Sequence, residues 1–180
     1  MITEHQTYDK SEQWEQYKDR GLLILRGVEC EFGLWGADGH LLIYGINSDK
    51  GIPYTLSDAI RLAKEKNWAL AAAHPMSSMC PSSLIDNNFE GVDALEINGR
   101  SSLGDNKKTA EVARQLNIPL IGGSDAHDGK GVGNVYTEFQ GKICNIQDLV
   151  AELKSGDYAH QLYEPPKHDG IFDFLKKFYL

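Results

Sequence analysis

Short apolar runs alternate with amphipathic segments along most of the chain. The runs have the length of single strands and cover residues 22–25, 40–46, 69–73, 92–97 and 118–122. Helical spacing lies between them, at residues 11–20, 55–63 and 105–116, and again after residue 145. Continuous apolar strands that alternate with helices are typical of a sheet covered on both faces. The pattern therefore predicts a parallel α/β sheet or barrel.

Capping residues mark where the predicted helices begin. Thr55, followed three residues later by Asp58, has the pattern of a capping box at a helix start. Asp105 and Asn145 are the expected caps of two later helices. Residues 171–178 carry apolar side chains at helical spacing and predict a packing helix in the tail.

Polar side chains stand where several predicted strands end. They are Glu29, His74, Glu96 and Asp125. In α/β barrels, active sites are built at the C-terminal ends of the strands. Histidine with carboxylate oxygen is the ligand chemistry of zinc, manganese and iron sites. Taken singly, each residue also fits a structural role, such as a hydrogen-bonded histidine or an exposed strand-end acid. As a set they favour a metal site.

Composition and charge narrow the classes of function. The 180 residues suit one domain with one core, and the net charge of −8 argues against a general nucleic-acid binder. A phosphorylated substrate stays compatible with this charge, because bound cations can reverse the local field. No apolar run reaches the length of a membrane span, and the first residues lack a secretory signal pattern. Three cysteines without metal-type spacing indicate reduced thiols, so a cytoplasmic protein is predicted.

Six short segments resemble successive motifs of the PHP (polymerase and histidinol phosphatase) family, in the family's order. They are residues 2–5 (Ile-Thr-Glu-His), 27–29 (Gly-Val-Glu), 40–45 (His-Leu-Leu-Ile-Tyr-Gly), 73–75 (Ala-His-Pro), 95–100 (Leu-Glu-Ile-Asn-Gly-Arg) and 123–127 (Gly-Ser-Asp-Ala-His). The last motif is fairly specific, whereas Ala-His-Pro alone is weak. The resemblance extends to about residue 139 of a single predicted PHP-like domain, residues 1–180, in which residues 140–180 form a C-terminal helix and packing tail.

The resemblance implies a distorted, seven-stranded β/α (TIM-like) barrel with up to three metal ions at the C-terminal ends of its strands. PHP proteins begin with a strand that ends in a His-x-His pair, and this sequence contains no such pair. We therefore expect the first strand to be missing, either because the gene product is shortened or because the protein is a degenerate relative. The open barrel edge beside the strand that ends at His5 would favour a homo-oligomer, unless the tail covers it.

Four side chains are implied as ligands of the first two metals. Glu29 would bridge both ions, His40 and His74 would complete the second site, and Asp125 would bind the first ion. Only the second site keeps three protein ligands, so one ion is the best supported. Zinc, manganese or iron fits this donor set.

The resemblance assigns further roles to neighbouring residues. His5 and His127 would bind the third metal. The resemblance implies that Glu96 orients a histidine ligand. A purely structural ion pair is an equally good interpretation of this residue. Arg100 is the candidate for gripping the substrate phosphate, because its planar fork suits phosphate geometry.

The implied reaction is hydrolysis of a small phosphate ester by a hydroxide that the metals hold, with Glu29 and Asp125 as the catalytic carboxylates. Loss of the His-x-His ligands predicts impaired turnover. Two other functions remain open: a non-catalytic PHP-like metal-binding or scaffold module, and an amidohydrolase-like hydrolase. A small phosphorylated molecule is the expected partner, and neither general nucleic-acid binding nor a membrane is expected.

Overall fold

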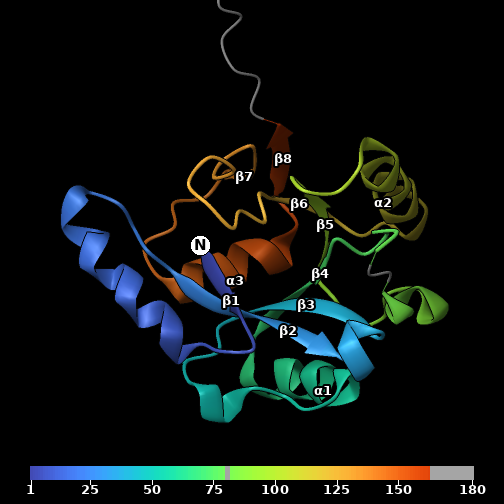
Figure 1. The fold of residues 1–180 in the computed structure, drawn as a ribbon, viewed down its shortest axis with the longest axis horizontal. Coiled ribbons are helices and arrows are strands. Elements are labelled where there is room, and N and C mark those ends of the chain that lie inside the picture. The colour runs from blue at the N-terminus through green and yellow to red at the C-terminus, as the bar shows by residue number, and fades with distance from the viewer. Residues whose placement is uncertain (80–81, 163–180) are drawn as a thin grey trace, which may run out of the picture.

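A six-stranded sheet runs through the protein, and its strands follow one another in sequence order (Figure 1). The computed structural model describes residues 1–79 and 82–162. The six strands are β1 (Ile2–His5), β2 (Arg26–Phe32), β3 (Gly39–Tyr44), β4 (Ala69–Ala73), β5 (Ala94–Asn98) and β6 (Leu120–Gly123). A second, two-stranded sheet pairs β7 (Val135–Phe139) with β8 (Tyr158–Leu162).

Within residues 1–79 and 82–162, three α-helices and four 3-10 helices connect the strands. The α-helices are α1 (Leu56–Lys66), α2 (Leu103–Leu116) and α3 (Ile146–Ser155), and the 3-10 helices are η1 (Asp9–Arg20), η2 (Leu34–Gly36), η3 (Asp49–Gly51) and η4 (Ser83–Asn87). Thr55 and Asn145 cap α1 and α3 as predicted. The expected cap of α2 was wrong: Ser102 is the N-cap, and its hydroxyl accepts a hydrogen bond from the backbone N–H of Asp105.

The sheet is mixed, which corrects the prediction of a parallel one. β3 runs antiparallel to both β2 and β4, while the other neighbouring strands are parallel. The connection from β2 to β3, residues 33–38, is too short for a parallel crossover, which takes about a dozen residues or more. Because β3 is reversed, His40 at its beginning lies beside the ends of its neighbours, opposite Glu31 of β2 and Ala73 of β4.

Apolar side chains cover both faces of the sheet. On one face, β2 places Val28, Cys30 and Phe32 in a cluster that also contains residues of α1 and α2. On the other face, residues of β3, β4 and β6 pack against Leu149, Val150 and Leu153 of α3. Successive side chains of a strand alternate between faces, so Glu29 points to the side opposite Cys30. Cys30 is a core residue, as predicted.

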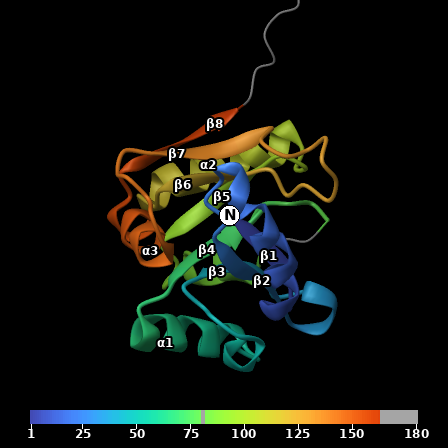
Figure 2. The same ribbon diagram turned by 90° about the vertical axis from the view of Figure 1, so that its left-hand side faces the viewer.

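The second sheet lies against the last strand of the first one (Figure 2). The Thr137 hydroxyl of β7 donates a hydrogen bond to the Gly122 carbonyl of β6, at 3.0 Å, and accepts one from the Gly122 N–H, at 2.9 Å. A Cβ on Gly122 would overlap the backbone carbonyl oxygen of Tyr136. This close approach of β6 and β7 requires a glycine.

The coarse fold prediction is confirmed as a mixed α/β protein whose six-stranded sheet curls into half a barrel. A seventh strand and the loss of the first one stay predictions. The strand expected to run from residue 22 towards residues 27–29 is present as β2, but it begins only at Arg26, and Leu22 and Leu23 before it are exposed. The predicted tail helix lies outside the described residues. None of the described helices is both long enough and apolar enough to cross a membrane.

Candidate metal centre

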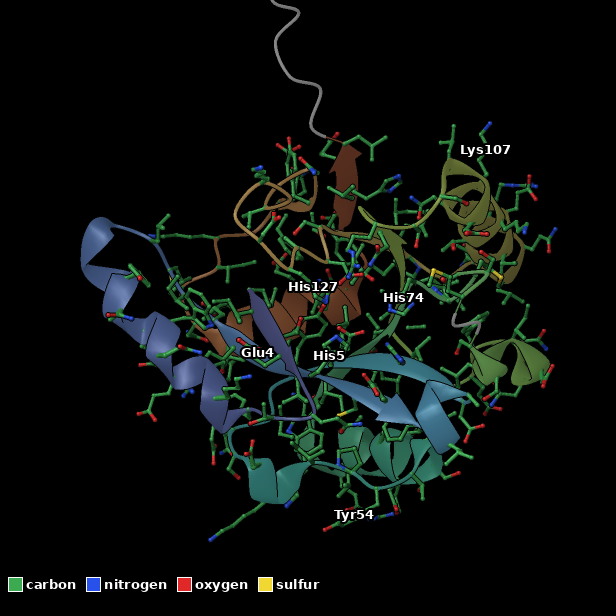
Figure 3. The ribbon with its side chains drawn as sticks, in the orientation of Figure 1. Glu4, His5, Tyr54, His74, Lys107 and His127 are labelled. Carbon is green, nitrogen blue, oxygen red and sulfur yellow. The ribbon has the colours of Figure 1, made fainter. Side chains whose placement is uncertain are left out.

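Glu29 of β2 is the centre of a group of histidines. Its Oε1 lies 2.8 Å from Nδ1 of His40 and 3.3 Å from Nε2 of His74, and its Oε2 lies 3.6 Å from Nε2 of His5. His5 ends β1, His74 directly follows β4, and His40 lies at the beginning of the reversed strand β3. Glu29 and Glu96 were expected at strand ends, but they lie in the middle of β2 and β5. Figure 3 shows His5, His74 and His127 gathered in the middle of the molecule, away from Tyr54 and Lys107 at its periphery. The predicted convergence at one sheet edge is therefore present.

The donor set of this group fits a divalent cation. His5, Glu29 and His40 each offer a ligand atom, and these atoms all lie within 4.8 Å of one another. The ring of His74 is 4.9 Å from the ring of His40, and its Nδ1 is buried without a hydrogen-bond partner in the part of the chain that is described. A buried polar atom is normally satisfied. Two or three imidazole nitrogens around one carboxylate are suited to zinc, manganese or iron.

The pKa values of the two buried acids near the cluster are shifted in opposite directions. Burial alone would raise the pKa of Glu29, but hydrogen bonds from His40 and His74 outweigh it and lower the pKa to about 2. Burial raises the pKa of Glu96 well above its usual range. Burial would lower the pKa of His74, and the hydrogen bond to Glu29 raises it instead. Glu29 is thus held as a carboxylate, the form that a metal ligand needs.

A second polar group follows β5 and β6. Nδ2 of the buried Asn98 donates hydrogen bonds to Glu96 Oε2, at 2.9 Å, and to Asp125 Oδ2, at 3.3 Å. The same Glu96 oxygen accepts the backbone N–H of His74 at 3.1 Å. Glu96 therefore contacts the main chain of His74, and the buried Asn98 joins it to Asp125. A Cβ on Gly123 would overlap Glu96 Oε1, so β6 passes directly over this acid.

Arg100 and His127 lie at the open side of this second group. Arg100 Nη1 is 2.8 Å from His127 Nδ1 and 3.8 Å from Asp125 Oδ1. The ring of His127 lies 6.2 Å from that of His5. An open pocket of about 270 Å³ adjoins them, lined by Gly99, Arg100, Ser124, Ala126, His127, Asp128, Gly131 and Asn134. All eight candidate residues named from the sequence thus lie in two linked groups along one edge.

Sequence reasoning missed two residues of this edge. Glu31 Oε1 lies 2.9 Å from His5 Nδ1, and Asn98 links the two acids described above. Glu31 follows Glu29 by two positions, so strand periodicity would have placed it on the same face. Asn98 lies between Glu96 and Arg100 in the fifth motif, but nothing in its residue type singled it out.

The fold and the site define a mixed α/β half-barrel protein with a histidine–carboxylate cluster at its strand ends. A family model described as PHP-associated matches residues 104–158. No protein of curated function matches the sequence. This match covers less than a third of the chain and agrees with the resemblance to the PHP family that the motifs indicated.

Three solved structures share the fold. PsfC from Pseudomonas syringae is 21% identical with a TM-score of 0.63, over 80% of this chain and 61% of that one. A two-domain protein from Bacteroides vulgatus that contains a predicted PHP-like metal-dependent phosphoesterase is 21% identical with a TM-score of 0.67, over 90% of this chain and 55% of that one. A proposed metal-dependent phosphoesterase from Bifidobacterium adolescentis is 17% identical with a TM-score of 0.56, over 86% of this chain and 84% of that one. The chain thus spans less than two thirds of the length of the first two proteins.

Proposed function

We propose that the protein is a metal-dependent phosphoesterase that acts on a small phosphate ester. The observation that carries the proposal is the group around Glu29, in which three histidines approach one buried carboxylate at the strand-end edge. The descriptions of the Bacteroides and Bifidobacterium proteins, which share the fold, support the same reaction class.

In this proposal Glu29, His40 and His74 hold the best-supported ion, and His5 of β1 can bind the same ion when the third site is empty, because it offers a ligand atom within 4.8 Å of those of Glu29 and His40. A divalent ion held there would activate a water molecule for attack and would polarise the phosphoryl group. Zinc commonly takes three protein ligands and leaves one position open, so this set suffices for one ion. Asp125 and His127 would contribute to further ions, each with fewer ligands from this chain.

Arg100 is the proposed phosphate-binding residue. Its guanidinium stands beside His127 at the open pocket, and its side chain is more than half exposed. The pocket is thus next to the histidine–carboxylate group, where a phosphate could contact both. A planar guanidinium can donate two parallel hydrogen bonds to phosphate oxygens. The volume of about 270 Å³ suits a small substrate or the terminal group of a larger one.

We further propose that turnover by these 180 residues is slow. A two-metal mechanism needs both ions at a fixed short separation. The first and third sites have two assigned ligands each, Glu29 with Asp125 and His5 with His127. A chain that binds one ion without hydrolysing phosphate esters would instead be the metal-binding module named above.

The test is metal content after dialysis against zinc or manganese, together with hydrolysis of an aryl phosphate. We expect about one ion per chain, and we expect His74→Ala to weaken its affinity at least tenfold. His160→Ala is the matched control, since His160 lies on β8, away from the cluster. If the unchanged protein binds no metal, or if His74→Ala binds it as well as the control does, the proposed site is wrong.

A further inference from the structure

His5 lies between two carboxylates of the same strand. Glu29 and Glu31 are two residues apart on β2 and point to the same face. Glu31 Oε1 is 2.9 Å from His5 Nδ1, whereas Glu29 Oε2 is 3.6 Å from His5 Nε2. The two ring nitrogens therefore face different acids, one half-exposed and one buried.

We propose that Glu31 is a positioning residue, which fixes the orientation and the tautomer of His5 so that Nε2 is presented to the cluster of His5, Glu29 and His40. This inference rests on the proposed metal site. A neutral imidazole carries one N–H, and the hydrogen bond made by one nitrogen decides which nitrogen keeps a free lone pair. An Nδ1–H donated to Glu31 leaves the Nε2 lone pair free for a metal, an arrangement that also raises the basicity of a ligand.

The backbone around this contact holds Glu31 and His5 in place. The Gln6 side chain donates a hydrogen bond from Nε2 to the carbonyl of Glu31 at 2.8 Å, and the Gln6 N–H donates to the carbonyl of Glu29 at 2.9 Å. Gln6 has a positive φ of 55°, which turns the chain sharply just after His5. These two hydrogen bonds hold the end of β1 against β2 directly beside His5.

The neighbouring acid on β1 does not share this role. Glu4 precedes His5, and its Oε1 accepts a hydrogen bond from the indole N–H of Trp14 at 3.0 Å. Adjacent strand residues point to opposite faces, so Glu4 is directed away from the cluster (Figure 3). Glu4→Ala is therefore a matched control that removes the same charge close to the same histidine.

The first measurement is the affinity for zinc alone, by competition with a chelator. We expect Glu31→Ala to weaken zinc binding by about tenfold to a hundredfold, the usual cost of losing a carboxylate behind a histidine ligand. The Glu31→Gln side chain keeps an oxygen that can accept the Nδ1–H, so this variant should lose less zinc affinity than Glu31→Ala. Glu4→Ala should bind zinc as the unchanged protein does. When His5 is already replaced by alanine, adding Glu31→Ala should lower the zinc affinity little further, because Glu31 acts through His5.

The second measurement needs no metal. Nitrogen-15 shifts of the His5 ring, at a pH where the ring is neutral, should show the proton on Nδ1 in the unchanged protein and in Glu31→Gln, and a mixture of tautomers in Glu31→Ala. The same tautomer in all three proteins, or equal zinc losses with and without His5, would overturn the inference. If the unchanged protein binds no zinc but the shifts change as expected, the proposed metal site fails while the positioning role stands.

Discussion

At the scale of single residues, a buried amide holds two acids at the edge of the sheet. Asn98 is 1% exposed, and its Nδ2 donates to both Glu96 and Asp125. Its Oδ1 accepts the backbone N–H of Arg100 at 2.8 Å and of Ser101 at 3.2 Å. One side chain thus shapes the loop that carries Arg100 and also orients Asp125.

We predict that Asn98→Ala destabilises the protein by about 2 to 4 kcal/mol, because it removes hydrogen bonds to the buried Glu96 and the partly buried Asp125 and leaves the backbone N–H groups of Arg100 and Ser101 without this acceptor. Denaturant unfolding monitored by circular dichroism measures this change. Asn87→Ala is the control. Asn87 is exposed in η4, so its replacement should lower the free energy of unfolding by less than about 0.5 kcal/mol. A loss at Asn98 as small as that at Asn87 would contradict the structural role.

At the scale of elements, local signals were predictable from the sequence and relations between distant segments were not. The caps Thr55 and Asn145 act within one helical turn, so the residue pattern was sufficient to find them. The direction of β3 depends on the length of the connection before it, and an apolar run reads the same in either direction. The apolar run at residues 22–25 predicts a strand that starts at residue 22, but β2 begins at Arg26, next to the residues that pair with β3.

The candidate site was predictable for a similar reason. Its residues lie at the ends of apolar runs and in motifs that resemble those of a known family, so their convergence could be expected. Glu31 and Asn98 were missed because their roles depend on which side chain they contact, and those contacts join separate strands. β7 and β8 were not predicted as strands either. They are short, their residues are mostly half-buried or exposed, and they lack a continuous apolar run.

Asp49 of η3 fastens the segment between β1 and η1. Its carboxylate accepts hydrogen bonds from the backbone N–H groups of Tyr8 and Asp9 and from the hydroxyl of Thr7. These bonds favour the charged form, and the backbone bond from Asp9 contributes most to lowering the pKa of Asp49.

We predict that Asp49→Asn destabilises the protein near neutral pH and that the difference from the unchanged protein shrinks in acid. A carboxyl whose pKa is lowered by folding contributes stability above its unfolded pKa of about 3.9, and this stability is lost as the pH falls through the folded pKa. Thermal unfolding between pH 7 and pH 3 measures the difference. Asp86→Asn, at an exposed acid of η4, is the control. A difference that is constant with pH would contradict the argument.

At the scale of the whole molecule, β1 is an edge strand of the six-stranded sheet in the described part of the chain. Within the six-stranded sheet β1 pairs only with β2. Exposed apolar side chains lie close to it: Met1 is 48% exposed, Leu22 60% and Leu23 48%. The Ile2 N–H donates to the Leu25 carbonyl on the side of β1 that pairs with β2, so residues 22–25 lead directly into this pair of strands. An edge strand next to apolar surface is a template for pairing with another chain.

We predict that the protein self-associates through this edge. Replacing both Leu22 and Leu23 with serine should lower the apparent mass in sedimentation or light scattering at a fixed protein concentration. Leu103→Ser, at a leucine that is 70% exposed at the start of α2, should leave it unchanged. A protein that is already monomeric at high concentration would show that the edge is not used for association.

The two glycines that end β6 impose a constraint on how the sequence can change. The obstacle beside Gly123 is the end of the Glu96 side chain, whereas the obstacle beside Gly122 is the backbone of Tyr136 in the second sheet. A shorter acid at position 96 could make room for an alanine at 123, so the effects of substitutions at these two positions will not add. No side-chain replacement can relieve the overlap at 122. The junction between the two sheets therefore permits paired substitutions at positions 96 and 123, but position 122 has to remain glycine for the sheets to approach this closely.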